Sequence, residues 1–445
     1  MIDLASIADL RTGLVPPAIY SDPDLYQLEL QNVFGRSWLF LAHDSQLPKP
    51  GSFVQTYMGE DPVLVVRQRD GSVKAFLNQC RHRGMRICRA EAGTAKTFTC
   101  TYHGWAYDLE GTLINVPAEE LAYHGKIDKA RWSTHKVPRI ASHKGFYFGC
   151  WSPETPEFLD YLGEDMVWYF DAVVDRYEGG LELVPGTSKW VIDCNWKFAS
   201  EQFASDMYHV PISHASGNIA LTENPRFQGP LPYELPGRQF TGNGHGVGTF
   251  WLPELVVPGM DDLFRGPVYQ EWVAGQQEAI YSRMGRDQIL KGGEPHTTIF
   301  PNFSYLGVTP TMRVWHPRGP AQVEVWAWTY MPKEAPDQVK EAIRQGNQLA
   351  FGPAGVFETD DGENWTEIQQ VLRGWKARSA PFNVQMGLGY EEHDAHGAPG
   401  TTNQVYAETA ARGFYQRWSD LIRGLSWEQI AELGKQREAE EVQPA

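Results

Sequence analysis

Residues 80–103 of the chain read CRHRGMRICRAEAGTAKTFTCTYH. Each end of this stretch carries one thiol and one imidazole, namely Cys80 with His82 and Cys100 with His103. A glycine lies close behind each pair, at Gly84 and Gly104, and glycine lets the backbone approach a bulky centre. The flanking segments 63–76 and 106–115 read as hairpins around Asp-Gly and Glu-Gly turns. We therefore expect a small all-β module over residues 38–156.

Four soft ligands in two tight groups predict a metal centre. A structural zinc ion takes four such ligands in a tetrahedron. A [2Fe–2S] cluster of the Rieske kind takes two cysteines on one iron and two histidines on the other. The interleaved order, with one cysteine and one histidine in each loop, favours the cluster, because zinc fingers usually keep like ligands together. A zinc-stapled binding protein is the alternative. The other cysteines are expected to be buried small hydrophobic residues: Cys88, Cys150 and Cys194.

A second group of candidate ligands lies around residue 209. The segment from Gln202 to His209 is predicted to be helical, which puts Gln202, Asp206 and His209 on one face. Pro211 is expected to end this helix at Val210, so that His214 on the next segment can face the same ion. Two imidazoles and one carboxylate form the facial triad of non-haem Fe(II) oxygenases. Judged from the residues alone, His209 and His214 could equally be ordinary histidines that bind no metal.

The candidate for the carboxylate lies far along the chain, in the stretch 357–365. Asp360 and Asp361 are adjacent there and precede a helix predicted over 363–376. A capping box of Asp360 and Glu363 is the alternative explanation for these acids. The remaining histidines are expected to be structural or surface residues: His43, His124, His135, His143, His245, His296, His316, His393 and His396.

Together these motifs resemble the Rieske non-haem iron aromatic-ring-hydroxylating dioxygenases, large (alpha) subunit. The likeness is nearest to the biphenyl, phenylpropionate and polycyclic aromatic hydrocarbon branches. The family's C-x-H…C-x-x-H and D-x-Y-H-x4-H patterns are matched by Cys80, His82, Cys100 and His103, and by Asp206, Tyr208, His209 and His214. The stretch 357–365 is similar to the third-ligand segment, whose second acid binds iron, and this implies Asp361. The resemblance extends from Tyr20 to about residue 423.

The resemblance implies an α+β fold with an inserted all-β domain. Residues 38–156 would form the Rieske [2Fe–2S] domain, and residues 1–37 with 157–445 the catalytic domain, an antiparallel sheet covered by helices. Each chain would hold one [2Fe–2S] cluster and one mononuclear Fe(II). The implied partners are other alpha subunits and small beta subunits in an α3β3 hexamer, with a ferredoxin and a separate reductase that uses NADH. A pure Rieske electron carrier would end after the β module.

The implied reaction adds both atoms of O2 to an aromatic ring and gives a cis-dihydrodiol, in aromatic-compound catabolism. Asp206 would bridge His103 of one subunit and His209 of its neighbour and so carry electrons between the centres. An angular dioxygenase, a monooxygenase and a dioxygenase for an aromatic acid share these motifs and remain alternatives. The substrate pocket is expected to be apolar and to contain Gln202, Phe203, Met207, Val210, Leu306, Val308, Phe351 and Phe357.

The amino-acid composition limits the classes of partner and the cellular location that we expect for this protein. Its 445 residues include 39 Lys and Arg against 55 Asp and Glu, a formal charge of −16. Such a charge repels phosphate backbones and anionic lipid surfaces, so we expect no nucleic acid or membrane partner. No run of 18 apolar residues and no secretory signal are evident, and five cysteines make no disulfide framework. A cytoplasmic location is expected.

Overall fold

A computed structural model describes residues 3–221, 236–256 and 265–441. The chain divides into two compact units: Phe34–Thr155, and Met1–Val33 together with Pro156–Ala445. The first unit begins at residue 34 rather than at 38. The hydroxyl of Thr155 donates to the carbonyl oxygen of Arg36 at 2.8 Å. The last residue of this unit is therefore hydrogen-bonded to the segment with which the unit begins.

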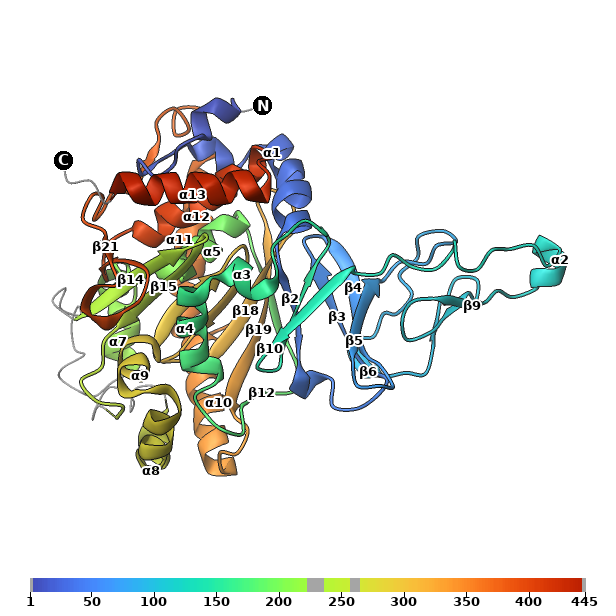
Figure 1. The fold of residues 1–445 in the computed structure, drawn as a ribbon, viewed down its shortest axis with the longest axis horizontal. Coiled ribbons are helices and arrows are strands. Elements are labelled where there is room, and N and C mark those ends of the chain that lie inside the picture. The colour runs from blue at the N-terminus through green and yellow to red at the C-terminus, as the bar shows by residue number, and fades with distance from the viewer. Residues whose placement is uncertain (1–2, 222–235, 257–264, 442–445) are drawn as a thin grey trace. The chain divides into compact units, whose positions relative to one another are not determined.

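Unit 34–155 is built from three small antiparallel sheets, whose strands are coloured blue to cyan in Figure 1. The predicted hairpin over 63–76 is confirmed, because β4 pairs with β5 across the Asp70-Gly71 turn. Phe53, Leu64, Val66 and Phe76 fill the core that these strands enclose. In sheet order the strands are β10 (Arg139–His143), β11 (Phe146–Cys150) and β2 (Leu39–His43); β5 (Val73–Leu77), β4 (Asp61–Arg67), β3 (Ser52–Met58) and β6 (Ala92–Thr94); and β7 (Phe98–Thr99), β8 (Ala106–Tyr107) and β9 (Leu113–Asn115), with helix α2 (Glu119–Tyr123) after β9.

The other unit contains one large antiparallel sheet. Its order is β12-β19-β18-β17-β16-β15-β14-β22-β21, and β13 also pairs with β19. A separate two-stranded pair joins β1 (Leu14–Val15) to β20 (Phe382–Asn383). The large sheet comprises β12 (Leu181–Leu183), β13 (Ser188–Ile192), β14 (Gly237–Gly242), β15 (His245–Phe250), β16 (Pro295–Ile299), β17 (Phe303–Leu306), β18 (Thr311–Pro317), β19 (Val323–Pro332), β21 (Glu392–His393) and β22 (Thr401–Gln404).

The sequence predicts strands over 297–305 and 311–315 that flank an alternating strand over 322–330, but the structure divides 297–305 between two strands. Residues 300–302 turn the chain between β16 and β17, which then pair with each other from His296↔Leu306 to Ile299↔Phe303. Pro301 lies in this turn, where the lack of an N–H removes no ladder hydrogen bond. Consequently β17 does not flank β19; β18 separates them, and the turn brings His296 and Leu306 side by side.

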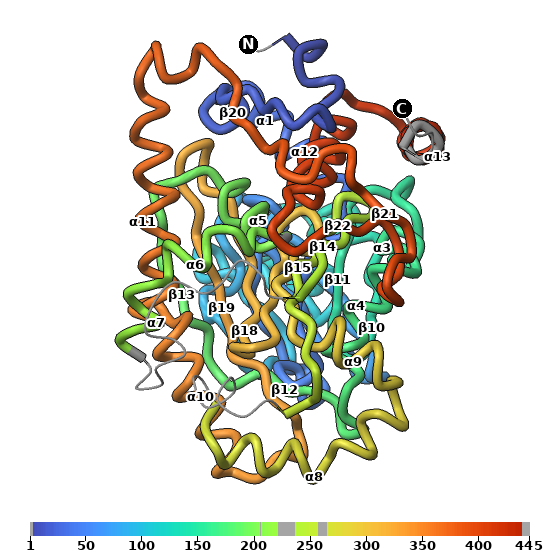
Figure 2. Tube along the Cα trace, turned by 90° about the vertical axis from the view of Figure 1, so that its left-hand side faces the viewer, coloured from blue at the N-terminus to red at the C-terminus, as the bar shows by residue number. Residues whose placement is uncertain are grey.

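Helices cover this sheet (Figures 1 and 2). Helix α5 lies across β15 to β18, and α12 packs in turn against α5, β14 and β15. The sequence of residues 337–349 also predicts a helix, and the structure confirms it as α10, which contacts β19, α8 and α11. The helices are α1 (Pro23–Leu28), α3 (Phe158–Leu162), α4 (Glu164–Val174), α5 (Trp196–Ser205), α6 (Val210–Ser213), α7 (Ala215–Leu221), α8 (Gly266–Met284), α9 (Arg286–Gly292), α10 (Asp337–Phe351), α11 (Val356–Val371), α12 (Thr409–Ile422) and α13 (Trp427–Glu441).

A single buried acid ties the N-terminal segment to α5 and α12. Glu29 is 1% exposed and pairs with the ammonium group of Lys197. The indole N–H groups of Trp196 and Trp418 each donate to it at 2.8 Å. A buried charge is costly unless it is paired and hydrogen-bonded, and here both conditions hold. Among the described helices, none is both long and apolar enough to cross a membrane.

Candidate active site

The chain breaks its helix before the first candidate histidine. Helix α5 ends at Ser205, so the prediction of a helix through His209 is wrong. The Oδ1 atom of Asp206 accepts from the backbone N–H groups of Tyr208 and His209, at 2.9 and 3.1 Å. Short acidic side chains commonly compete in this way with helical hydrogen bonds. Pro211 does not end a helix either: it lies in the first turn of α6, where its missing N–H costs nothing.

This break brings two imidazoles and one carboxylate together. One ligand atom from each of His209, His214 and Asp361 lies within 4.8 Å of the others. The two Nε2 atoms are 3.2 Å apart, and the Oδ1 atom of Asp361 is 3.3 Å from that of His209 and 3.5 Å from that of His214. The three groups therefore converge on one point.

The two adjacent acids of α11 have different positions in this group. The helix begins at Val356 after Gly355, so the capping-box reading of Asp360 and Glu363 is wrong and both acids lie inside the helix. Asp361 is 1% exposed and faces both Nε2 atoms. Asp360 lies instead 3.2 Å from the Nδ1 atom of His214, on the far side of that ring.

The electrostatics of the group fit a bound cation. Burial alone would raise the pKa of Asp361, yet that pKa lies below its usual value because of the hydrogen bond and charge of His209. Burial would likewise lower the pKa of His209, but the carboxylates of Asp206 and Asp361 raise it well above the usual value. Such a site favours positive charge, and neutral imidazoles with a carboxylate are the donor set of mononuclear iron.

Asp206 contacts His209 through the ring nitrogen that faces away from the other two ligand atoms. Its Oδ2 atom lies 3.3 Å from Nδ1 of His209, on the side of that ring opposite the other two ligand atoms. A carboxylate in this position orients a metal-bound histidine. The side chain of Asp206 is nevertheless 35% exposed, and the neighbouring Tyr208 is 47% exposed. Asp206 thus contacts the buried group and remains open to the surface.

Three of the predicted pocket residues form an aromatic wall beside the ligand group. The ring of Phe357 lies 4.6 Å from that of His214, and Phe351 lies 5.7 Å from Phe357 and 6.3 Å from Phe203. Gln202 is held between the group and the core: its Nε2 lies 3.5 Å from Nε2 of His209, while its Oε1 accepts from the indole of Trp365 at 2.7 Å.

The other four predicted pocket residues are more dispersed. Met207 packs with Val405 and Tyr406 in a small cluster that contains none of the three phenylalanines, since the chain has already turned at Asp206. Val210 begins α6 and is half-buried. Leu306 is buried at the end of β17, and Val308 lies half-buried in the turn that follows.

The Cys and His pairs of the inserted unit lie on two turns of the same shape. Gly84 N–H donates to the carbonyl of Cys80 at 2.9 Å, and Gly104 N–H to that of Cys100 at 3.0 Å. Both glycines have positive φ, +74° and +76°, which favours glycine at these positions.

The four side chains of these turns face one another in pairs. Cys80 and Cys100 are buried, and burial is the main cause that raises the pKa of the Cys80 thiol. The Nδ1 atoms of His82 and His103 are 3.1 Å apart, at the more exposed end of the site. Two inner thiols and two outer imidazoles are the donor set of a Rieske cluster.

Comparison with known proteins identifies the family of both parts of the chain. Residues 37–125 match the family model of the Rieske [2Fe–2S] domain, and residues 164–424 match that of the ring hydroxylating alpha subunit (catalytic domain). The chain belongs to the ring-hydroxylating alpha subunits. It is accordingly an oxidoreductase that carries a [2Fe–2S] cluster and a mononuclear iron, and the predicted fold class is confirmed.

Relatives of this alpha subunit extend over nearly the whole chain. The biphenyl 2,3-dioxygenase subunit alpha of Rhodococcus jostii is 48% identical over 433 residues, which cover 96% of this chain and 92% of the relative. The benzene 1,2-dioxygenase subunit alpha of Pseudomonas putida is 46% identical and covers 96% and 95%. A solved structure of naphthalene 1,2-dioxygenase with indole bound in the active site is 33% identical, with a TM-score of 0.90 and 99% coverage of both chains.

Sequence reasoning missed one histidine of this alpha subunit that lies beside the ligand group. His296 on β16 stacks on Phe203 at 4.6 Å, and its ring is 6.5 Å from that of His209. Burial lowers its pKa to about 3, so the ring is neutral, and its Nδ1 is buried without a hydrogen-bond partner among the described residues. A lone histidine in a strand gives no sequence signal; only the packing of β16 beneath α5 reveals its position.

A buried ion pair behind the aromatic wall was also missed. Arg313 on β18 pairs with Glu358 on α11, and both side chains are almost completely buried. The guanidinium carbon lies 4.7 Å from the ring of Phe203 and 5.3 Å from that of Phe351. Burial raises the pKa of Glu358 to about 7, although the charge of Arg313 acts to lower it.

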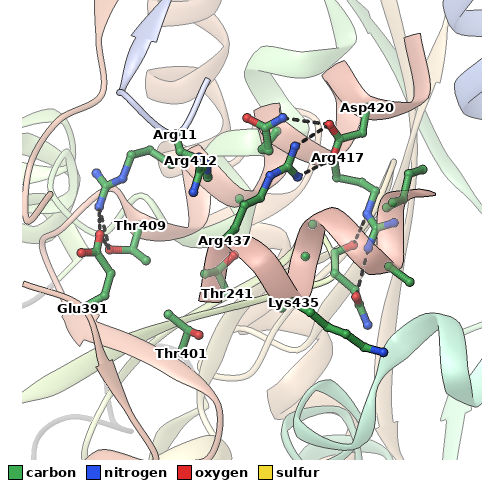
Figure 3. Close-up of a pocket in the computed structure, with 18 of the residues that line it drawn as sticks. Arg11, Thr241, Glu391, Thr401, Thr409, Arg412, Arg417, Asp420, Lys435 and Arg437 are labelled. Carbon is green, nitrogen blue, oxygen red and sulfur yellow. Dashed lines mark hydrogen bonds and ion pairs between the residues drawn. The ribbon is translucent and has the colours of Figure 1, made fainter. Parts of the chain in front are cut away.

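A cavity of about 620 Å³ lies elsewhere in the alpha subunit (Figure 3). Two ion pairs join labelled side chains of its lining: Arg412 with Glu391, and Arg437 with Asp420. None of the predicted pocket residues lines it. This cavity is therefore separate from the His209, His214 and Asp361 group, none of which lines it.

Proposed function

We propose that this alpha subunit dihydroxylates a neutral aromatic ring, of the size found in biphenyl, benzene or naphthalene. The balanced reaction consumes the arene, O2, two electrons and two protons and yields a cis-dihydrodiol. The electrons come ultimately from NADH through a separate reductase and a ferredoxin. The observation that carries the proposal is the convergence of His209, His214 and Asp361 beside an aromatic wall.

We assign the mononuclear iron to these three residues and the cluster to Cys80, His82, Cys100 and His103. Iron held by two histidines and one carboxylate keeps open positions at which O2 can be activated. The cluster held by these four residues would supply storage for one electron. The protein contributes binding, orientation and access.

The side chains around the site favour an apolar substrate without a negative charge. Phe203, Phe351 and Phe357 offer ring faces for stacking or edge contacts with an arene. An aromatic acid would need a cation, and the cation behind this wall, Arg313, is already paired with Glu358. Burial lowers the pKa of His296 and keeps its ring neutral, so this residue supplies a polar group without a charge.

We further propose that Asp206 connects the two metal centres across a subunit boundary. Its carboxylate faces Nδ1 of His209 and is open to the surface, where it can accept the ring N–H of His103 from a neighbouring alpha subunit. The cluster of each chain would then supply electrons to the iron site of one neighbour. Its own iron site would receive electrons from the cluster of the other neighbour. This arrangement requires a closed ring, which we take to be α3, with beta subunits completing α3β3.

Product analysis tests the reaction class. The assembled oxygenase with its redox partners should convert biphenyl, benzene or naphthalene to cis-dihydrodiols that contain both atoms of isotopically heavy O2. Phenylpropionate should react much more slowly. Incorporation of a single oxygen atom would identify a monooxygenase, and preference for the acid would overturn the substrate class.

Replacing the bridging acid tests the electron path. Asp206→Ala should leave the visible spectrum of the Rieske cluster unchanged, while turnover falls by orders of magnitude. Asp193→Ala, at an exposed position before α5, serves as the matched control and should retain normal turnover. Near-normal turnover of Asp206→Ala would refute the bridge.

A further inference from the structure

Helix α5 carries one acid, Glu201, which lies five residues before Asp206 and has no role in the function proposed so far. Glu201 is half-buried on the side of α5 that faces α12. The hydroxyl of Tyr415, on α12, donates to its Oε2 atom at 3.2 Å. The hydroxyl of Tyr20 lies 2.6 Å from that of Tyr415, and both tyrosines are buried. Hydrogen bonds thus connect the N-terminal segment that carries Tyr20, helix α12 and helix α5 through the carboxyl group of Glu201.

The charges around Glu201 are mainly negative. Asp206 at the end of α5 and Glu408 just before α12 both raise its pKa, and His209 lowers it. Lys197, one turn earlier on α5, is held by Glu29 and does not compensate Glu201. Burial is the largest cause, and with the two acids it raises the pKa of Glu201 to about 8 against the opposing hydrogen bond from Tyr415.

We propose that Glu201 is a positioning residue that holds a proton at neutral pH and thereby leaves Asp206 as the ionised acid that accepts the histidine N–H. Asp206 bends away from the helix axis immediately after α5, and its Oδ2 atom must stay directed at His209. A neutral Glu201 can accept from Tyr415 on one oxygen and donate from the other. An ionised Glu201 would repel Asp206 and compete with it for donors.

This inference rests on the bridge assigned to Asp206 under the proposed function, and it adds a pH dependence to that bridge. As pH rises through the pKa of Glu201, its proton is lost to solvent and a second negative charge appears beside Asp206. The bridge should then weaken. The rate of electron transfer to the catalytic site should fall about tenfold per pH unit above the midpoint.

Single-turnover product formation by the fully reduced, assembled oxygenase measures this fall without the ferredoxin or reductase. The wild-type rate should decline with a midpoint near the Glu201 pKa of about 8. Glu201→Gln, which cannot ionise but keeps an acceptor for Tyr415, should remain active at neutral pH and lose this decline. Glu341→Gln, at an exposed position on α10, is the control and should keep the wild-type profile.

Two neighbours should move the midpoint in opposite directions. Tyr415→Phe removes a donor that favours ionised Glu201, so the midpoint should rise. Glu408→Gln removes a negative charge but keeps an acceptor for the backbone N–H of Met386, so the midpoint should fall. A decline that persists unchanged in Glu201→Gln overturns the inference, as does loss of activity at every pH in that variant.

Infrared spectroscopy provides a readout that does not depend on turnover. The oxidised, substrate-free wild type should show a protonated-carboxyl C=O band that disappears with the same midpoint and is missing in Glu201→Gln. If this band titrates while Asp206→Ala retains normal turnover, the inference falls together with the bridge. If Glu201→Gln removes no band at neutral pH, the inference alone is refuted and the bridge stands.

Discussion

At the scale of single residues, neighbouring acids have separate tasks because each faces a different atom. Asp361 faces the Nε2 atoms of both histidines, whereas Asp360 faces only the Nδ1 atom of His214. The ligand set was predicted from the resemblance to the family. The local pattern of the residues around 360 pointed instead to a helix cap, because a short stretch of sequence does not show that the helix already begins at Val356.

Asparagine at each of these two positions separates their roles. Asp361→Asn should lose the mononuclear iron and lower turnover by at least two orders of magnitude, while the two cluster irons remain. Asp360→Asn should keep the iron and lower turnover or affinity by about 10- to 100-fold, the usual cost of altering a group behind a ligand. Metal analysis and the cluster spectrum provide the measurement, and equal iron loss in both variants would contradict the assignment.

Phe357 is the aromatic residue expected to direct the substrate. Its ring is 4.6 Å from His214, so it borders the space beside the proposed iron. Phe357→Ala should change the ratio of dihydrodiols formed from biphenyl, because removal of the Phe357 ring allows the substrate ring a second orientation. Chromatography of the products measures the ratio, and Phe382→Ala, in β20 away from the ligand group, is the control. An unchanged ratio and rate would remove Phe357 from the pocket.

At the scale of elements, the site depends on where helices end and on which strands they cover. The hairpin pattern over 63–76, the alternation over 322–330 and the helical pattern over 337–349 correctly predict β4 with β5, β19 and α10. Such patterns fail at 202–209 and at 297–305, where backbone hydrogen bonds accepted by the Asp206 side chain and a turn at 300–302 override local propensity. His296, Glu201 and the pairing of Arg313 with Glu358 depend on contacts between distant segments, which no single sequence reveals.

The buried ion pair between β18 and α11 should be important for stability. Removing one partner of such a pair typically costs about 3–5 kcal/mol, because the other charge stays buried without compensation. Arg313→Met and Glu358→Gln should each lower the thermal midpoint of the assembled enzyme, and the double variant should recover part of the loss. If the two single losses simply add in the double variant, the pair is not coupled.

At the scale of the whole molecule, charge is distributed unequally between the two units. Residues 34–155 contain 16 Lys and Arg against 11 Asp and Glu, a net charge of +5, so the remainder of the chain carries −21. Opposite charges favour contact between the inserted unit of one chain and the larger unit of another. This supports the head-to-tail ring in which a cluster serves the neighbouring iron.

Mixed assemblies test that ring directly. One alpha subunit carries Cys80→Ser, which abolishes the cluster, and the other carries Asp361→Ala, which abolishes the iron site. Neither homogeneous oxygenase should turn over. Random mixing in equal amounts should restore about a quarter of wild-type activity, because one junction in four pairs an intact cluster with an intact iron site. Complete inactivity of the mixture would show that electrons travel within one chain.

The hydrogen bond between Thr155 and Arg36 joins the two points at which the chain enters and leaves its inserted unit. Because these ends meet, the insertion leaves the host chain with almost no gap, and a short linker could close either piece. Chain ends that lie close together are a condition under which domain insertion is tolerated. Because its two ends lie together, unit 34–155 enters and leaves the larger unit at neighbouring points of the chain, as an inserted domain does.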